Sequence, residues 1–80
     1  MKYANVTTLN EIAQGNFCKV KFIKLKNSEK NRILDIGIVP NTILKVLGKS
    51  AFGDPTAYLV RGSVIALRCE CTRNIIVEKI

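Results

Sequence analysis

The stretch that decides the fold is Phe17-Cys18-Lys19-Val20-Lys21-Phe22-Ile23-Lys24-Leu25. Apolar residues and lysines alternate up to Phe22, as expected for a β-strand with one face in water. The alternation then shifts by one position, because Phe22 and Ile23 are adjacent apolar residues. Keeping every lysine in water therefore requires one extra residue, a β-bulge, at this point. A bulge bends its strand, and bent strands favour a small sheet that closes into a barrel.

A helix is predicted on each side of this strand. Thr8-Leu9-Asn10-Glu11 matches a capping box, which predicts a helix of one or two turns that ends at Gly15. After the strand, Ser28 is expected to cap a second helix. That helix has an inward stripe of Ile33, Leu34 and Ile36, with Gly37 as its stop and Ile38 packed against its end.

Four further strands follow the second helix. Val39-Pro40-Asn41-Thr42 predicts a type II turn that leads into a strand over residues 42–49. Residues 50–56 form a loop in which Phe52 is exposed or folds back. Residues 56–61 and 63–68 predict a hairpin that turns at Arg61-Gly62, and a polar corner over residues 69–74 precedes a last strand at residues 75–77.

The sequence therefore predicts an all-β fold, a small β barrel of five strands with one short N-terminal helix and one helix between strands 1 and 2. A chain of 80 residues is long enough for one domain, residues 1–80. The expected core side chains are Leu9, Ile12, Val20, Phe22, Leu25, Ile33, Leu34, Leu44, Val46, Leu59, Ile65, Leu67, Ile75 and Val77.

Composition argues for a binding protein rather than an enzyme. Thirteen Lys and Arg against six Asp and Glu give a net charge of +7, which favours acidic partners. The chain has no His, the commonest general base and metal ligand. No nucleophile has an evident base partner and no glycine-rich phosphate loop is present. We therefore expect neither catalytic, cofactor-binding nor metal-binding residues.

The beginning of the chain and its cysteines indicate a cytosolic protein. Met1 to Thr8 contains no apolar signal core, and no apolar run approaches the ~20 residues that span a bilayer. Three Cys cannot form a complete set of intrachain disulfides, which suits a reducing compartment. Cys69 and Cys71 could ligate a soft metal with help from Cys18, but we favour structural burial because Cys is among the most buried residue types.

Six of the thirteen basic residues lie within the fourteen positions from Lys19 to Arg32. They could follow nucleic-acid phosphates, or lie against an acidic protein domain or the anionic face of a membrane. The alternative is that alternating lysines protect an exposed strand and keep the chain soluble. The aromatic residues Tyr3, Phe17, Phe22, Phe52 and Tyr58 are too scattered for a base-stacking platform, so nucleic acid is the weaker hypothesis. The six residues are Lys19, Lys21, Lys24, Lys26, Lys30 and Arg32.

A set of landmarks spread over residues 8–77 resembles the FeoA family. In order, they are Leu9, Gly15, Arg32, Leu34, Asp35-Ile36-Gly37, Pro40, Gly53-Asp54-Pro55, Arg61-Gly62, Ala66-Leu67-Arg68 and Ile75-Ile76-Val77. The resemblance implies an SH3-like barrel that acts as a cytosolic accessory protein of bacterial ferrous iron uptake and works with the membrane GTPase transporter FeoB. The same fold also occurs as a domain of metal-dependent repressors.

Two positions depart from the family pattern. Asn41 stands where the family usually has Gly, and Asn is the next best residue at positive φ, so the turn is expected to survive. Cys69-Glu70-Cys71 replaces a corner that is usually acidic, which leaves the surface chemistry of that corner open.

We expect a partner-binding surface on the helix end and turn from Arg32 to Asn41 and on the loop from Phe52 to Pro55, because loops on a rigid scaffold often carry recognition. Asp54 could contact a partner, although bonding to its own backbone is favoured. The resemblance implies the cytosolic domain of FeoB as the partner. No stable nucleic-acid complex and no membrane insertion are expected, and weak self-association is left open. The runner-up is a basic module that binds nucleic acid or serves a metal-dependent repressor. The candidate residues are Arg32, Asp35, Gly37, Pro40, Asn41, Phe52, Gly53, Asp54, Pro55, Arg61 and Arg68.

Overall fold

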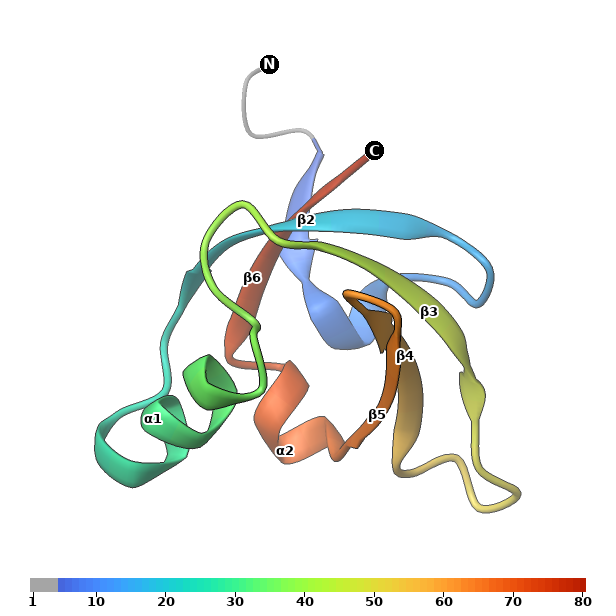
Figure 1. The fold of residues 1–80 in the computed structure, drawn as a ribbon. Helices are drawn as coiled ribbons and strands as arrows, with labels where there is room; N and C mark the ends of the chain where they lie inside the picture. The colour runs from blue at the N-terminus through green and yellow to red at the C-terminus, as the bar shows by residue number, and fades with distance from the viewer. Residues whose placement is uncertain (1–4) are drawn as a thin grey trace.

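The fold is a curled antiparallel sheet with one helix on its flank and a short one at its end (Figure 1). The structure is a computed structural model that describes residues 5–80. The strands follow the order β1-β6-β2-β3-β4-β5, with antiparallel neighbours. Their bounds are β1 Val6–Thr8, β2 Phe17–Ile23, β3 Ile43–Lys49, β4 Thr56–Val60, β5 Ser63–Leu67 and β6 Ile75–Lys79.

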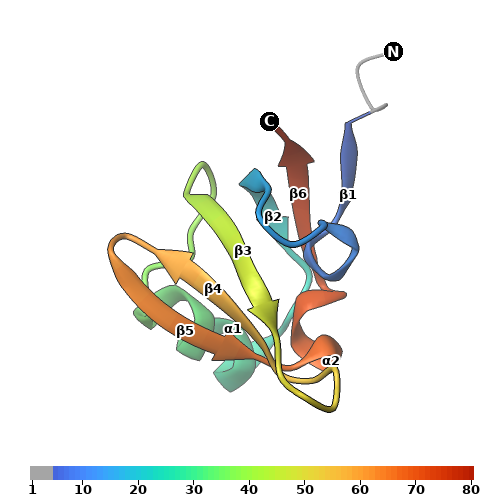
Figure 2. The same ribbon diagram turned by 90° about the vertical axis from the view of Figure 1, so that its right-hand side faces the viewer.

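The predicted closed barrel is wrong in one respect, because β1 and β5 are the two edges of the sheet and do not pair with each other. Figure 2 shows the sheet bending between β3 and β4, so that the β4–β5 hairpin turns under the core. The strand count is six rather than five. The additional strand is β1, a three-residue segment whose partner β6 lies at the other end of the chain.

The predicted bulge in β2 is present and bends that strand. Val20 pairs with Val77 and Phe22 pairs with Ile76, so Lys21 is the extra residue. The bulge places Lys21 and Phe22 outside, and Phe22 is 52% exposed. The prediction that Phe22 lies in the core is therefore wrong, because Ile23 takes the inward position instead.

The N-terminal helix is shorter than predicted. Leu9–Glu11 forms a single 3-10 turn, η1, and Thr8 belongs to β1. The predicted capping box is wrong, since no side chain caps this turn. The Thr8 hydroxyl instead donates a hydrogen bond to Oδ1 of Asn10 at 2.6 Å.

The second predicted helix is α1, Asn27–Asp35, between β2 and β3. Ser28 does not cap it, because the helix already begins at Asn27 and the carbonyl of Lys26 accepts the amide of Lys30. The C-terminal prediction is confirmed. Gly37 has a φ of 102°, its amide donates to the carbonyl of Leu34, and the amide of Ile38 donates to the carbonyl of Ile33, which together form a Schellman motif.

Both predicted turns are confirmed. The amide of Thr42 donates to the carbonyl of Val39 at 3.0 Å and Asn41 has a φ of 78°, as a type II turn requires. Arg61 and Gly62 have φ values of 50° and 85°, which match a type I′ hairpin. The predicted polar corner after β5 is wrong, because Cys69–Thr72 forms a helical turn, α2.

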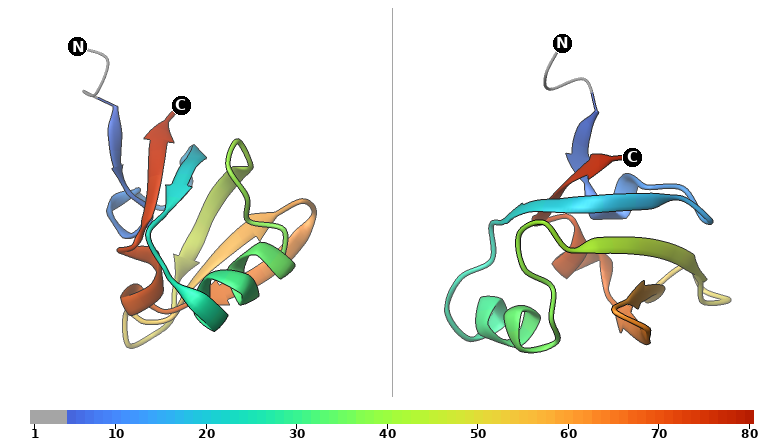
Figure 3. Two further views of the ribbon diagram at one scale, coloured as in Figure 1. Left: turned by 90° about the vertical axis from the view of Figure 1, so that its left-hand side faces the viewer. Right: turned by 45° about the horizontal axis from the view of Figure 1, so that its top comes forward.

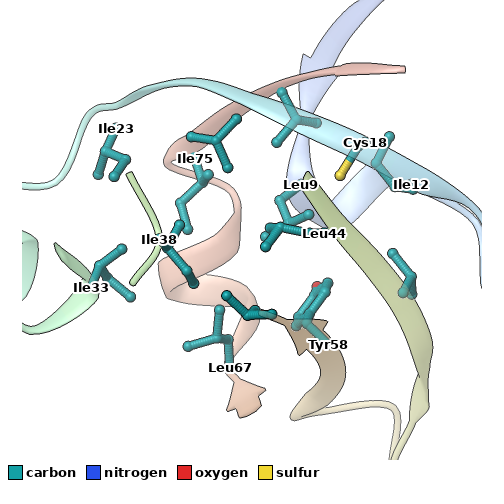
Figure 4. Close-up of a cluster of buried hydrophobic side chains, with 14 of the residues drawn as sticks. Leu9, Ile12, Cys18, Ile23, Ile33, Ile38, Leu44, Tyr58, Leu67 and Ile75 are labelled. Atoms are coloured by element: carbon teal, nitrogen blue, oxygen red, sulfur yellow. The ribbon is translucent and has the colours of Figure 1, made fainter. Parts of the chain in front are cut away.

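The core lies between the inner face of the sheet, α1 and α2 (Figure 4). Ten of the fourteen predicted core residues are buried there, whereas Phe22 is exposed and Leu34, Leu59 and Ile65 are only half-buried. The omitted core residues include Tyr58 on β4, which is 2% exposed and lies at one side of the cluster in Figure 4. The others that the prediction missed are Cys18, Ile23, Ile38 and Val60.

Two predictions involve residues 1–4, which lie outside the described residues. These are the absence of a signal segment in Met1 to Thr8 and the position of Tyr3. Within residues 5–80, no helix has the length and apolar character that crossing a membrane needs.

Candidate partner-binding site

A shallow hollow of about 310 Å³ lies where α1, the end of β5 and α2 meet. Arg32 lines it from α1, and Arg68 lines it from its position between β5 and α2. Both arginines are exposed, and Leu67 is the buried residue among those that line the hollow. The remaining lining residues are Glu29, Ile36, Ala66, Glu70 and Cys71.

The hollow holds charges of both signs around a half-buried thiol. Burial raises the pKa of Cys71, while the charge of Arg32 lowers it and those of Glu29 and Glu70 raise it. Among the described residues, the only ion pair within 4 Å is Lys21 with Glu78, so Arg32 and Arg68 form no direct ion pair with Glu29 or Glu70, which line the same hollow. Their guanidinium groups can therefore donate hydrogen bonds to carboxylates of another molecule.

The end of α1 packs against the β4–β5 hairpin beside this hollow. The side chain of Arg61 lies so close to Gly37 that a Cβ at position 37 would be 3.3 Å from the Cδ of Arg61. The hydroxyl of Thr42 donates to the carbonyl of Gly37 and accepts the amide of Val39, which joins the helix end to the type II turn. Position 37 therefore requires glycine for two reasons, the positive φ of the backbone and the close approach of the Arg61 side chain.

The Gly53-Asp54-Pro55 loop supports α2. Oδ1 of Asp54 accepts the amide of Cys69, the first residue of α2, at 2.8 Å. This bond satisfies one of the free amides at a helix start and places a negative charge there. Asp54 therefore bonds another segment of the backbone, fifteen residues away, rather than its own loop as favoured from the sequence. The loop is closed locally by the Ser50 hydroxyl, which donates to the carbonyl of Asp54.

The structure brings together some of the candidate residues and separates others. Arg32 and Arg68 share the hollow, and Gly37 contacts Arg61. Asp35, Pro40 and Asn41 are exposed on the helix end and the turn. Phe52, which is 96% exposed, and Gly53 lie in the β3–β4 loop, at the opposite end of the molecule from that turn (Figures 1 and 2). Pro55 is half-buried in the same loop.

Sequence reasoning missed the residues that α2 contributes. Glu70 and Cys71 line the hollow because Cys69–Thr72 turns as a helix, and the sequence indicated only a polar corner. Ile36 and Ala66 were recognised as landmarks without a surface role. The sequence offered no signal for α2, because its first amide is bonded by the side chain of Asp54, fifteen residues away.

The cysteines do not behave as a group. Cys18 is fully buried, Cys71 is half-buried and Cys69 is exposed, so the favoured structural burial is wrong for Cys69. Burial raises the pKa of Cys18 to about 11. Within residues 5–80, no three residues among His, Cys, Asp and Glu lie close enough together to hold a metal ion.

The fold and this surface define a class of protein, a small antiparallel β module with an arginine-lined hollow between its helices and its sheet. A family model described as the FeoA domain matches residues 7–79, and the chain belongs to this family. The SH3-like fold expected from the sequence is thus the fold of the family.

Solved structures agree with this assignment. The FeoA-like protein of Clostridium acetobutylicum is 32% identical over 96% of this chain and 90% of its own, with a TM-score of 0.86. FeoA of Chlorobium tepidum is 26% identical over 92% of this chain and 70% of its own, with a TM-score of 0.87. A manganese-dependent transcriptional repressor, 19% identical, has the same fold over 94% of this chain and 37% of its own, with a TM-score of 0.84. Among curated proteins, none matches this chain.

Proposed function

We propose that this chain is a non-enzymatic accessory protein of ferrous iron uptake that binds the cytosolic domain of the transporter FeoB. Membership of the FeoA family supports the role in iron transport. The proposal places the protein in the cytoplasm, on the inner side of the membrane that contains the transporter.

The observation that carries the proposal is the pair of exposed arginines in the hollow between α1, β5 and α2. Arginine is enriched among the residues that dominate protein interfaces, because its fork makes two hydrogen bonds to one carboxylate. The apolar side chains of Ile36 and Leu67 line the same hollow. A partner that inserts an apolar side chain and presents a carboxylate beside it fits this combination.

The test is capture of the purified full chain by immobilised cytosolic domain of FeoB. We expect the unmodified protein to bind. Arg32→Gln and Arg68→Gln are each expected to weaken binding at least about tenfold, the loss typical of an interface arginine. Arg73→Gln is the matched control, because Arg73 is exposed at the end of α2 but does not line the hollow.

Two results would contradict the proposal. One is equal capture of all three variants, which would move the interface away from the hollow. The other is RNA binding in a parallel filter assay at physiological salt with no capture by the transporter domain, which would favour the basic nucleic-acid module considered above.

A further inference from the structure

The outer face of β2 and β3 carries lysines and large apolar side chains in alternation. Directly paired residues of antiparallel strands point to the same side of the sheet, and the register pairs Phe17 with Lys45 and Lys19 with Ile43. These side chains point away from the core, since Cys18, between two of them, is fully buried. The ammonium of Lys45 lies 5.4 Å from the centre of the Phe17 ring.

Exposed apolar side chains gather on this face. Six large hydrophobic residues are exposed within residues 5–80, and four of them point outward from the sheet. Phe17 and Ile43 are 48% and 45% exposed, and Phe22 continues the row beyond the bulge. Val64 is also on the outer side of the sheet, but it lies on β5, beyond the bend between β3 and β4, and is not part of this face (Figure 2).

The charge of the same face is mostly positive, because Lys19, Lys21 and Lys45 lie there with one carboxylate, Glu78, which the register pairs with Lys19. The described strands contain five lysines, no arginine and a single acidic residue, Glu78, which pairs with Lys21 at 3.7 Å. All four arginines lie outside the strands, on α1, on the β4–β5 turn and around α2. Of the five strand lysines, Lys49 and Lys79 pair with the inward residues Thr56 and Cys18, so Lys19, Lys21 and Lys45 are the lysines of the outer face.

Protection of a sheet edge does not explain these lysines. Edge strands commonly carry lysine to prevent pairing with other chains. β2 and β3 are interior strands, and the edges β1 and β5 contain no lysine. Solubility would explain the lysines but not the aromatic and aliphatic side chains exposed beside them.

We propose that the outer face of β2 and β3 binds the surface of an anionic lipid bilayer. Lysine ammonium groups are attracted to the negative headgroups, and each contributes about a fivefold gain in binding near such a surface. The long lysine stems let the charges stay at headgroup level while Phe17 and Ile43 enter the interfacial layer. A protein partner rich in carboxylates is better matched by arginine, which this face lacks.

In the right-hand view of Figure 3, α1 lies below β2 and β3, so lipid binding would hold the hollow beside α1 toward the cytosol. The lipid contact does not require the transporter. Binding to vesicles and capture by the transporter domain are therefore separate measurements, and either can fail while the other succeeds.

The test is cosedimentation of the full chain with vesicles of equimolar phosphatidylglycerol and phosphatidylcholine, against vesicles of phosphatidylcholine alone. We expect binding to the anionic vesicles only. Neutralising two lysines of the face, Lys19→Gln with Lys45→Gln, is expected to weaken binding about 30-fold. Lys26→Gln with Lys30→Gln removes the same charge at the start of α1 and is expected to change binding by less than about threefold, because those lysines lie away from the face.

A second pair of variants tests the apolar contribution. Phe17→Ser is expected to weaken vesicle binding several-fold, whereas Phe52→Ser, at an exposed phenylalanine outside the face, is expected to leave it unchanged. Urea unfolding curves of all variants check that each is folded.

Equal binding to both kinds of vesicle, no binding to either, or an equal loss in the Lys26 and Lys30 variant would each overturn the proposal. So would a Lys19 and Lys45 variant that binds vesicles normally but is no longer captured by the transporter domain, because the face would then serve an acidic protein.

Discussion

Cys18 has a thiol whose pKa is raised strongly by burial. It lies fully buried on β2, and burial raises the pKa of its thiol from 9.0 to about 11. In the unfolded chain the thiol ionises near pH 9, whereas the folded protein keeps the proton up to about pH 11. Between these values the unfolded state binds fewer protons, so the free energy of unfolding falls as the pH rises.

We predict that Cys18 contributes up to about 1.4 kcal/mol of lost stability per pH unit in this window. The measurement is urea unfolding of the native protein and of Cys18→Ala from below pH 9 to about pH 11. Cys18→Ala is expected to be less stable below pH 9 because of the cavity it leaves, but its stability should decline less steeply above that pH. The two proteins differ only at position 18, so parallel curves would refute the assignment.

The backbone conformations of residues that follow local rules could be predicted from the sequence. Gly37 at the helix end and Asn41 in the type II turn adopt positive φ because the local chain leaves few alternatives. The side chain of Asp54 was not predictable, because its partner, the amide of Cys69, belongs to another segment.

Among the elements, the C-terminal end of α1 is held by the backbone conformation of Gly37 and by the β4–β5 hairpin that packs against it. We predict that Gly37→Ala lowers the free energy of unfolding by about 1–2 kcal/mol, because alanine is strained at a φ of 102° and its Cβ would press on Arg61. Urea unfolding measures this change.

Gly48→Ala is the matched control within β3. Gly48 does not have a positive φ, and a Cβ there would meet only the end of the flexible Gln14 side chain, at 3.4 Å. We expect this variant to be neutral or stabilised by up to about 1 kcal/mol. If both variants lose the same stability, the backbone conformation at Gly37 is not the cause.

The sequence did not predict the elements whose formation depends on segments far away in the chain. β1 is a strand because its three residues pair with β6, and α2 forms where the Asp54 carboxylate accepts its first amide. The bulge in β2 was predictable from the shift in alternation. Its register was not, because the pairing with β6 decides that Lys21 is the extra residue and that Ile23, not Phe22, turns inward.

Across the whole molecule, the arginines and the strand lysines occupy two different surfaces. The arginines gather around the hollow by α1 and α2, and the lysines with exposed aromatic residues lie on the outer face of β2 and β3. The sequence indicated the basic cluster from Lys19 to Arg32 as one feature. The fold divides it, because β2 keeps Lys19 and Lys21 on the sheet while α1 carries Arg32 to the hollow.

The most direct test of the central claim is a titration of the ¹⁵N-labelled chain with the cytosolic domain of FeoB, followed by amide chemical shifts. The account predicts that the largest changes occur around the hollow, at Arg32, Ile36 and the residues from Ala66 to Cys71. Changes confined to the lysine face of β2 and β3, or the absence of any change at saturating transporter domain, would contradict it.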